Sequence, residues 1–152
     1  VGEVEELQAR LAKAGEVYWA EQVEIQRLGA AAWLAFKDNR IDDALTAMRE
    51  AADREDRTEK AAVTPGPIAP ARELLGEMLL QLKRPKEALA AFEITLKKEP
   101  NRFHALAGAA EAAQAAGETT TMRKYYQQLL QLTVKADSPG RPELVAARQN
   151  AK

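Results

Sequence analysis

Two glutamates and the only histidine are the side chains best suited to act together chemically. Glu73 and Glu77 lie four residues apart, which places both carboxylates on one face of an expected helix. Like charges at this spacing destabilise a helix by about 0.2–0.5 kcal/mol, so a bound cation or a basic partner would offset that loss. With His104 they would form the Glu, Glu, His set that holds metal ions in helix-bundle carboxylate proteins.

The motifs around these residues do not support a metal site. The sequence contains no His-x-x-x-His or Glu-x-x-His motif, and it has no cysteine. A single histidine is most simply a surface side chain. The sequence therefore predicts no metal and no cofactor, and Glu73, Glu77 and His104 remain an alternative metal set only.

Catalysis by a nucleophile is not expected either. Ser138 is the only serine, it lies in a terminal turn, and there is no cysteine to act in its place. The segment Pro65-Gly66-Pro67 lacks the backbone N–H groups that cradle a phosphate. The pair Asp42-Asp43 is typical of a solvated helix face. These observations predict that the protein is not an enzyme.

Composition narrows the range of partners and compartments. Charged residues make up 30% of the chain and leave a formal net charge of −1, whereas a nucleic-acid-binding domain normally carries a basic patch. The sequence has no run of about 18 apolar residues, so we expect no membrane insertion. The absence of cysteine excludes disulfides but leaves open whether a soluble protein of this kind is cytoplasmic or exported to the bacterial cell envelope. The first residue is Val1 rather than Met, which favours an excised fragment over a mature form.

Apolar residues recur with helical spacing along nearly the whole chain, and few β-branched residues are present to build a sheet. Gly15, Asp38-Asn39 and Ala116-Gly117 interrupt the helical pattern. Pro85 suits the first turn of a helix, and Asn101 is expected to cap the next one. The expected helices cover residues 3–13, 16–37, 41–52, 71–82, 85–98, 103–113, 122–132 and 141–150.

The helices repeat with a fixed period. Leu75-Gly76 and Phe92 are followed thirty-four residues later by Ala109-Ala110 and Tyr126. A period of about 34 residues is typical of arrays of helix pairs. Within a single domain spanning 1–152, we expect repeats at about 25–56, 69–100 and 103–134, a Pro-rich connection at about 55–70 and a terminal helix at about 141–150.

These spacings resemble the tetratricopeptide repeat (TPR), in which large and small residues hold fixed positions and a proline ends each repeat. Leu75-Gly76, Ala88, Phe92 and Pro100 match that pattern, while Thr95 stands where alanine is usual. The resemblance implies an all-α fold, a TPR-like α-solenoid of about three antiparallel helix pairs with flanking helices.

A second resemblance concerns segments between Thr58 and Phe103, which are similar to the C-terminal part of longer bacterial TPR proteins of unassigned role. Such relatives often carry a histidine after the Glu59-Lys60 pair. Ala61-Ala62 stand there in this chain, which argues further against a metal site.

In the TPR family the first helix of each pair lines the concave face, and this implies a set of groove residues. The set comprises Gln26, Trp33, Phe36, Lys37, Glu73, Glu77, Gln81, His104, Glu111 and Gln114. Its acidic members would select basic groups and its aromatic members apolar ones. The alternative interpretation is that these residues are solvated, with Trp33 and Phe36 packed against the N-terminal helix.

We therefore expect a protein-interaction scaffold that binds a peptide segment or helix of a protein partner in its groove. The Pro-rich connection is expected to contribute to the contact surface. Two other classes stay open at this point. One is a structural segment of a longer repeat protein, or a self-associating module, and the other is a metal-binding helical-repeat protein.

Overall fold

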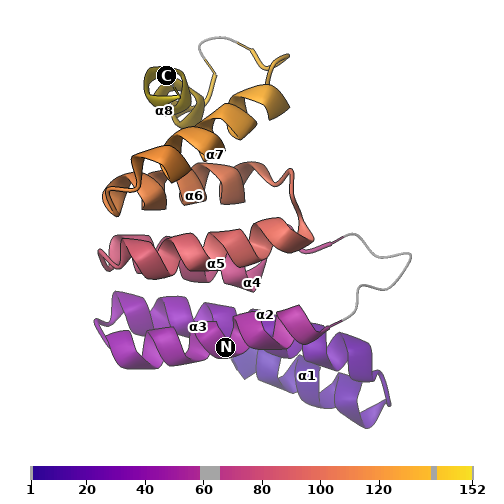
Figure 1. Cartoon of the computed structure of the whole chain (residues 1–152). Coiled ribbons are helices and arrows are strands. Elements are labelled where there is room, and N and C mark those ends of the chain that lie inside the picture. Colours follow the sequence, from indigo (N-terminus) through magenta and orange to yellow (C-terminus); the bar gives the residue numbers. More distant parts are fainter. Residues whose placement is uncertain (1, 59–65, 138–139, 152) are drawn as a thin grey trace. The chain divides into compact units, whose positions relative to one another are not determined.

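The structure is a computed structural model that describes residues 2–58, 66–137 and 140–151. All regular structure among these residues is α-helical, as the sequence predicted (Figure 1). The helices are α1 (Gly2–Lys13), α2 (Val17–Lys37), α3 (Ile41–Arg57), α4 (Ala71–Gln81), α5 (Pro85–Lys98), α6 (Phe103–Ala115), α7 (Thr119–Leu132) and α8 (Pro142–Asn150).

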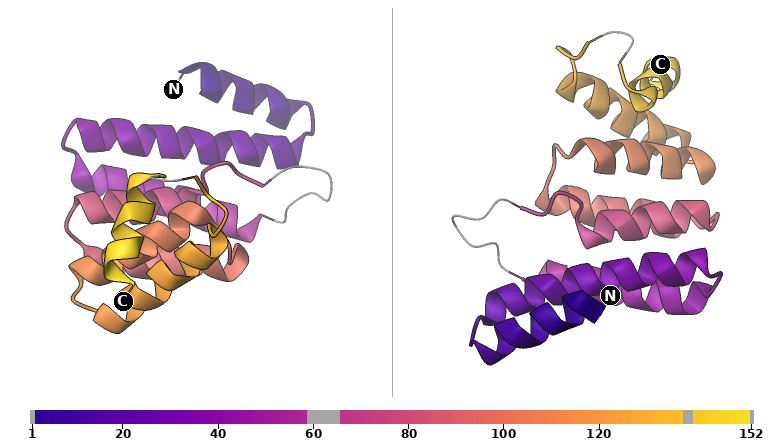
Figure 2. Two further views of the ribbon diagram at one scale, coloured as in Figure 1. Left: turned by 90° about the horizontal axis from the view of Figure 1, so that it is seen from above. Right: turned by 180° about the vertical axis from the view of Figure 1, so that it is seen from behind.

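The chain divides into two compact units, Val1–Leu75 and Gly76–Lys152, and each is described by itself. In the first unit α1 packs on α2, and α2 packs on α3. In the second unit α5 packs on α6, α6 on α7, and α7 on α8. The antiparallel hairpins of α2 with α3 and of α6 with α7 can be followed by colour in both views of Figure 2.

Three turns between the helices use residues that accept a left-handed backbone, whereas the turn between α4 and α5 places Lys83 there with φ of 57°. Gly15 and Gly117 both have φ of 79°, and Asn39 has φ of 60°. Glycine adopts this conformation without a steric penalty, and asparagine tolerates it better than most residues. These three positions are where the sequence predicted interruptions of the helical pattern.

Some helix ends differ from the sequence-based expectation. Asn101 does not cap α6: the N-cap position belongs to Arg102, without a side-chain hydrogen bond. The reason is a turn before the helix, closed by a hydrogen bond from the Arg102 N–H to the carbonyl oxygen of Glu99 at 3.2 Å. α3 continues to Arg57 and so enters the expected connection at 55–70, of which residues 59–65 lie outside the described residues.

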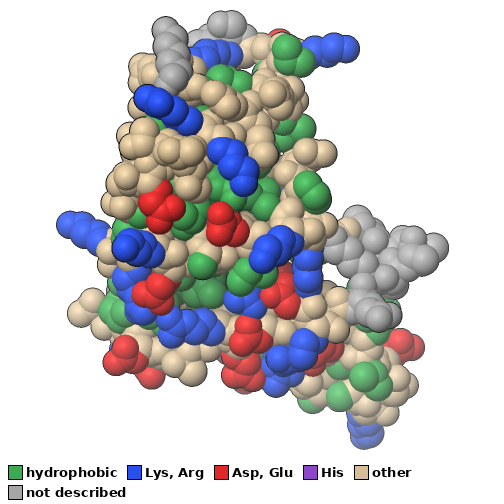
Figure 3. Space-filling view, viewed as in Figure 1, with side chains coloured by type: hydrophobic (Ala, Val, Ile, Leu, Met, Phe, Trp, Pro, Cys, Tyr) green, Lys and Arg blue, Asp and Glu red, His purple; other side chains and the backbone are tan. Residues whose placement is uncertain are grey.

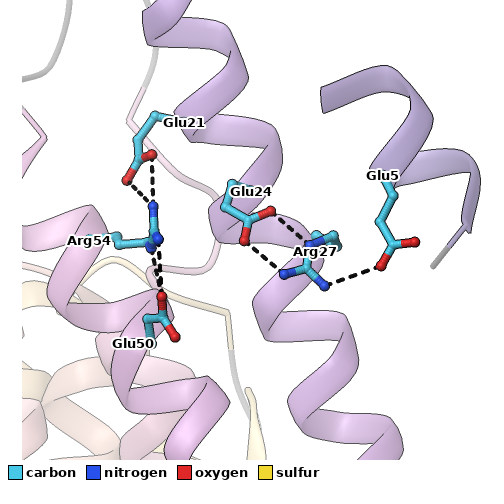
Figure 4. A network of polar contacts seen from close by, with 6 residues as sticks. All are labelled: Glu5, Glu21, Glu24, Arg27, Glu50 and Arg54. Atoms are coloured by element: carbon cyan, nitrogen blue, oxygen red, sulfur yellow. Dashed lines mark hydrogen bonds and ion pairs between the residues drawn. The ribbon is translucent and has the colours of Figure 1, made fainter. Parts of the chain in front are cut away.

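The first unit is held together by a seam of small residues and by ion pairs. Ala32 of α2 and Ala44 of α3 are fully buried, and small side chains allow helix axes to approach within about 8–10 Å. Figure 4 shows the charged network of α1, α2 and α3, formed by Glu5, Glu21, Glu24, Arg27, Glu50 and Arg54.

The network joins α1, α2 and α3 through two arginines. The Arg54 guanidinium reaches Glu21 of α2 at 3.1 Å and Glu50 of its own helix at 3.0 Å. Arg27 donates two hydrogen bonds of 2.7 Å to Glu24 and one of 3.4 Å to Glu5 of α1. The hydrogen bonds from Arg27 are the main reason that the pKa of the Glu24 carboxyl lies below its usual value. None of the described α1 residues is buried, so this contact and partial apolar packing attach α1 to α2.

Charged side chains also join the end of α3 to the start of α4. The Ala71 backbone N–H donates a hydrogen bond of 2.7 Å to a Glu55 carboxylate oxygen, which satisfies one of the unpaired N–H groups at a helix start. The Arg72 side chain, only 14% exposed, forms ion pairs with Asp53 and Asp56. The two ends of the connection are therefore fixed to each other within the first unit.

The core of the second unit is built around one aromatic ring. Phe92 of α5 is 1% exposed and faces two glycines, Gly76 of α4 and Gly108 of α6. A Cβ atom at Gly76 would lie only 2.7 Å from Phe92 Cζ. The absence of side chains at both glycines thus makes room for the ring. The buried face of α6 is otherwise lined by Leu106 and by alanines, among them Ala105, Ala109, Ala110, Ala112 and Ala113.

Candidate functional site

On α2, the expected groove residues divide into exposed polar ends and a half-buried aromatic pair. Gln26 and Lys37 are exposed, whereas Trp33 and Phe36 are half-buried. The two rings meet edge to face with their centroids 5.6 Å apart, an arrangement that aromatic pairs favour. Each ring therefore keeps a part of its surface open while the other part is packed.

α2 carries two further aromatic residues near its start, Tyr18 and Trp19, that sequence reasoning missed. Trp19 is 47% exposed and precedes Gln26 by seven residues, two helical turns, which places it on the same face. The helical spacing of residues 19, 26, 33 and 37 was a visible signal. The expected repeat frame begins only at about residue 25 and so does not include Trp19.

On α4, Glu73, Glu77 and Gln81 follow one another at four-residue intervals and so share one face of the helix. Their accessibility differs along that face. Gln81 is exposed and Glu77 is half-buried, but Glu73 is only 2% exposed. The expectation of an accessible Glu73 is therefore not met, and Glu77 is the first acidic side chain of this helix that a partner can reach.

On α6, His104, Glu111 and Gln114 are all exposed and lie on the face opposite the buried alanines. The hydroxyl of Tyr126 from α7 donates a hydrogen bond of 3.2 Å to the Gln114 side-chain oxygen. Burial, and secondly the negative charge of Glu111, raises the pKa of Tyr126. Glu111 and Gln114 are thus gathered beside Tyr126, an arrangement held by the packing of α6 on α7.

Most of these side chains are charged or able to form hydrogen bonds. Within residues 2–58, 66–137 and 140–151 no three His, Asp or Glu side chains are grouped so that they could hold a metal ion. None of the described helices combines the length and the apolar character that crossing a bilayer requires. On the face of the molecule drawn in Figure 3, acidic and basic side chains are interspersed rather than separated by sign.

A groove that the repeat pattern does not predict lies between α5 and α7 in the second unit. Its volume is about 720 Å³, and its lining residues are Glu93, Leu96, Lys97, Pro100, Asn101, Lys124, Tyr125, Gln128, Gln131 and Leu132. The Tyr125 hydroxyl donates a hydrogen bond of 2.8 Å to Glu93 and so joins the two helices. Burial, and then the hydrogen bond to Glu93, raises the pKa of Tyr125 well above its usual value.

Comparison with known proteins defines the class. The sequence model of the tetratricopeptide repeat family matches residues 30–94 and 74–142. Because these stretches cover most of the chain, the chain belongs to the tetratricopeptide repeat family. No curated protein sequence matches the chain.

Solved TPR structures share the fold at low sequence identity. The first TPR of Spaghetti (RPAP3), bound to the HSP90 peptide SRMEEVD, is similar with a TM-score of 0.64 at 15% identity, over 84% of this chain and 90% of that one. The first TPR domain of human RPAP3 gives a TM-score of 0.63 at 15% identity, over 84% and 90%. PcrH from Pseudomonas aeruginosa gives 0.61 at 15% identity, over 84% and 88%. The predicted TPR-like α-solenoid is thus confirmed.

Proposed function

We propose that this chain is a protein-interaction module that binds a segment of a partner protein on the open faces of its first helices. The observation that carries the proposal is the two-sided character of α6. One side of this helix is buried and consists of alanines and Leu106, and the other presents His104, Glu111 and Gln114 to solvent. Repeat arrays commonly bind along such a face. The Spaghetti TPR, whose structure holds an HSP90 peptide, supports this use of the fold.

The side chains suggest what each unit selects. In the second unit, Glu77 and Glu111 suit a basic side chain, while Gln81 and Gln114 offer both donors and acceptors to a peptide backbone. In the first unit, Trp19 and the open part of Trp33 suit apolar side chains. The second unit therefore favours segments with basic residues, and the first unit favours segments with apolar residues. The family's interaction role, rather than catalysis, is the function that these faces support.

The experiment is a selection of linear peptides from a displayed random library, followed by affinity measurement on the full chain. We expect basic and apolar peptides to be enriched. Glu111→Lys should lower the affinity for the basic peptides about tenfold, because it replaces one attraction with a repulsion. Asp137→Lys is the matched control, because it makes the same change in charge at an exposed position after α7. The proposal is contradicted if the two variants lose the same affinity, or if the selection enriches acidic peptides.

Self-association is a second candidate, favoured by exposed apolar side chains in the first unit. Leu7, Val17 and Trp19 are 44%, 75% and 47% exposed. If this surface joins two copies, sedimentation velocity of the full chain will show a concentration-dependent dimer, and Trp19→Ser together with Val17→Ser will return it to a monomer. A monomer over the whole concentration range would eliminate this candidate.

A further inference from the structure

The groove between α5 and α7 lies on the second helices of two successive pairs, and the proposed function does not use it. Lys97 and Asn101 come from the end of α5 and the turn after it, and Lys124 comes from α7. A volume of about 720 Å³ falls within the range of about 300–1,000 Å³ that is usual for ligand sites. The groove is formed entirely within the second unit.

The charges in this groove are unbalanced. Two lysines line it against one glutamate, and that glutamate already accepts the hydrogen bond from Tyr125. The Lys124 ammonium lies 4.9 Å from the centre of the Tyr125 ring. Neither Lys97 nor Lys124 forms an ion pair with a carboxylate in the described part of the chain, whereas Arg84 and Arg102 of the same unit are paired with Glu87 and Glu99.

The remaining lining residues suit a polypeptide. Asn101, Gln128 and Gln131 provide amide donors and acceptors, which match those of an extended peptide backbone. Leu96 and Leu132 provide apolar walls, and Leu132 is 42% exposed. A small inorganic anion would use the lysines but would leave the amides and the apolar walls without contacts.

We propose that the groove between α5 and α7 is a second binding site, which takes an extended acidic peptide segment whose carboxylates pair with Lys97 and Lys124. Apolar side chains of that segment contact Leu96 and Leu132, and its backbone binds the three amide side chains. The site is separate from the faces of α2, α4 and α6, and its ligand has the opposite charge. The chain would thereby hold two segments of different charge at once.

The test uses three fluorescein-labelled synthetic peptides in which leucine alternates with glutamate, glutamine or lysine. We expect fluorescence anisotropy to show binding of the glutamate peptide to the full chain, with affinity decreasing as salt screens the charges. The double variant Lys97→Glu/Lys124→Glu should weaken it by about tenfold or more, and Lys97→Gln/Lys124→Gln by less. Circular dichroism confirms that each variant is folded.

The control Lys83→Glu/Lys86→Glu makes the same change in net charge at exposed positions outside the groove. It should leave the affinity unchanged, and so should Glu111→Lys, which separates this site from the proposed function. The proposal is overturned if the control loses as much affinity as the groove variant, if the glutamine peptide binds as well as the glutamate peptide, or if inorganic phosphate displaces the peptide more effectively than chloride at equal ionic strength.

Discussion

Replacement of Phe92 by alanine is expected to lower the free energy of unfolding by about 3–5 kcal/mol, the range for truncating a buried phenylalanine. Phe92 is the largest fully buried side chain among the described residues, at 1% exposure. It contacts the backbone at Gly76 and Gly108, and rigid glycine backbone cannot fill the space that the ring leaves. The measurement is urea unfolding of the full chain followed by circular dichroism.

The control for this prediction is Ile94→Ala on the same helix. Ile94 is 37% exposed, so its truncation should change the stability by no more than about 0.5–1 kcal/mol. Both tryptophans, Trp19 and Trp33, lie in the first unit, so their fluorescence reports that unit separately. If Phe92→Ala and Ile94→Ala have the same effect on the circular dichroism transition, the ring is not the centre of the core.

Gly108→Ala is expected to destabilise the protein by about 1–3 kcal/mol, because the added methyl group overlaps the Phe92 ring. The ring is enclosed and cannot move aside without disturbing its other contacts. In the Phe92→Ala background the same methyl group enters the vacated space, so Gly108→Ala should then be neutral or stabilising by up to about 1 kcal/mol. Unfolding free energies of the two single variants and the double variant form the cycle that measures this coupling.

Gly29→Ala is the matched control for that cycle. Gly29 also lies within a helix, but a Cβ atom there would meet nothing within 4 Å. Since alanine forms helices better than glycine, this change should stabilise the protein by up to about 1 kcal/mol. A destabilising effect of the same size at both glycines would show that contact with the ring is not the cause.

The fold could be predicted from the sequence because helix formation and repeat packing both depend on local spacing. The interruptions at Gly15, Asn39 and Gly117 and the placement of Phe92 followed from the pattern. The pairing of Phe92 with Gly108 did not, because the repeat frame aligns Gly76 with Ala110 rather than with Gly108. Which atoms meet across two helices depends on packing angles that one sequence does not specify.

The candidate site was harder to predict from the sequence than the fold. The frame identifies which helix face points away from the core, and Glu111 and Gln114 are indeed exposed. It does not give the depth of each side chain, and the burial of Glu73 was therefore missed. The pair Lys97 and Lys124 was missed because the frame assigns binding to first helices, and the spacing of these lysines does not follow the repeat.

The most direct test of the proposed binding faces is a map of amide chemical-shift changes in the isotope-labelled full chain as a selected peptide is added. The account predicts that the changes gather on the open faces of the first helices, at Gln26 and Trp33 in the first unit or at Gln81 and Glu111 in the second. Changes confined to α3, α5 and α7, with none on α2, α4 and α6, would contradict it.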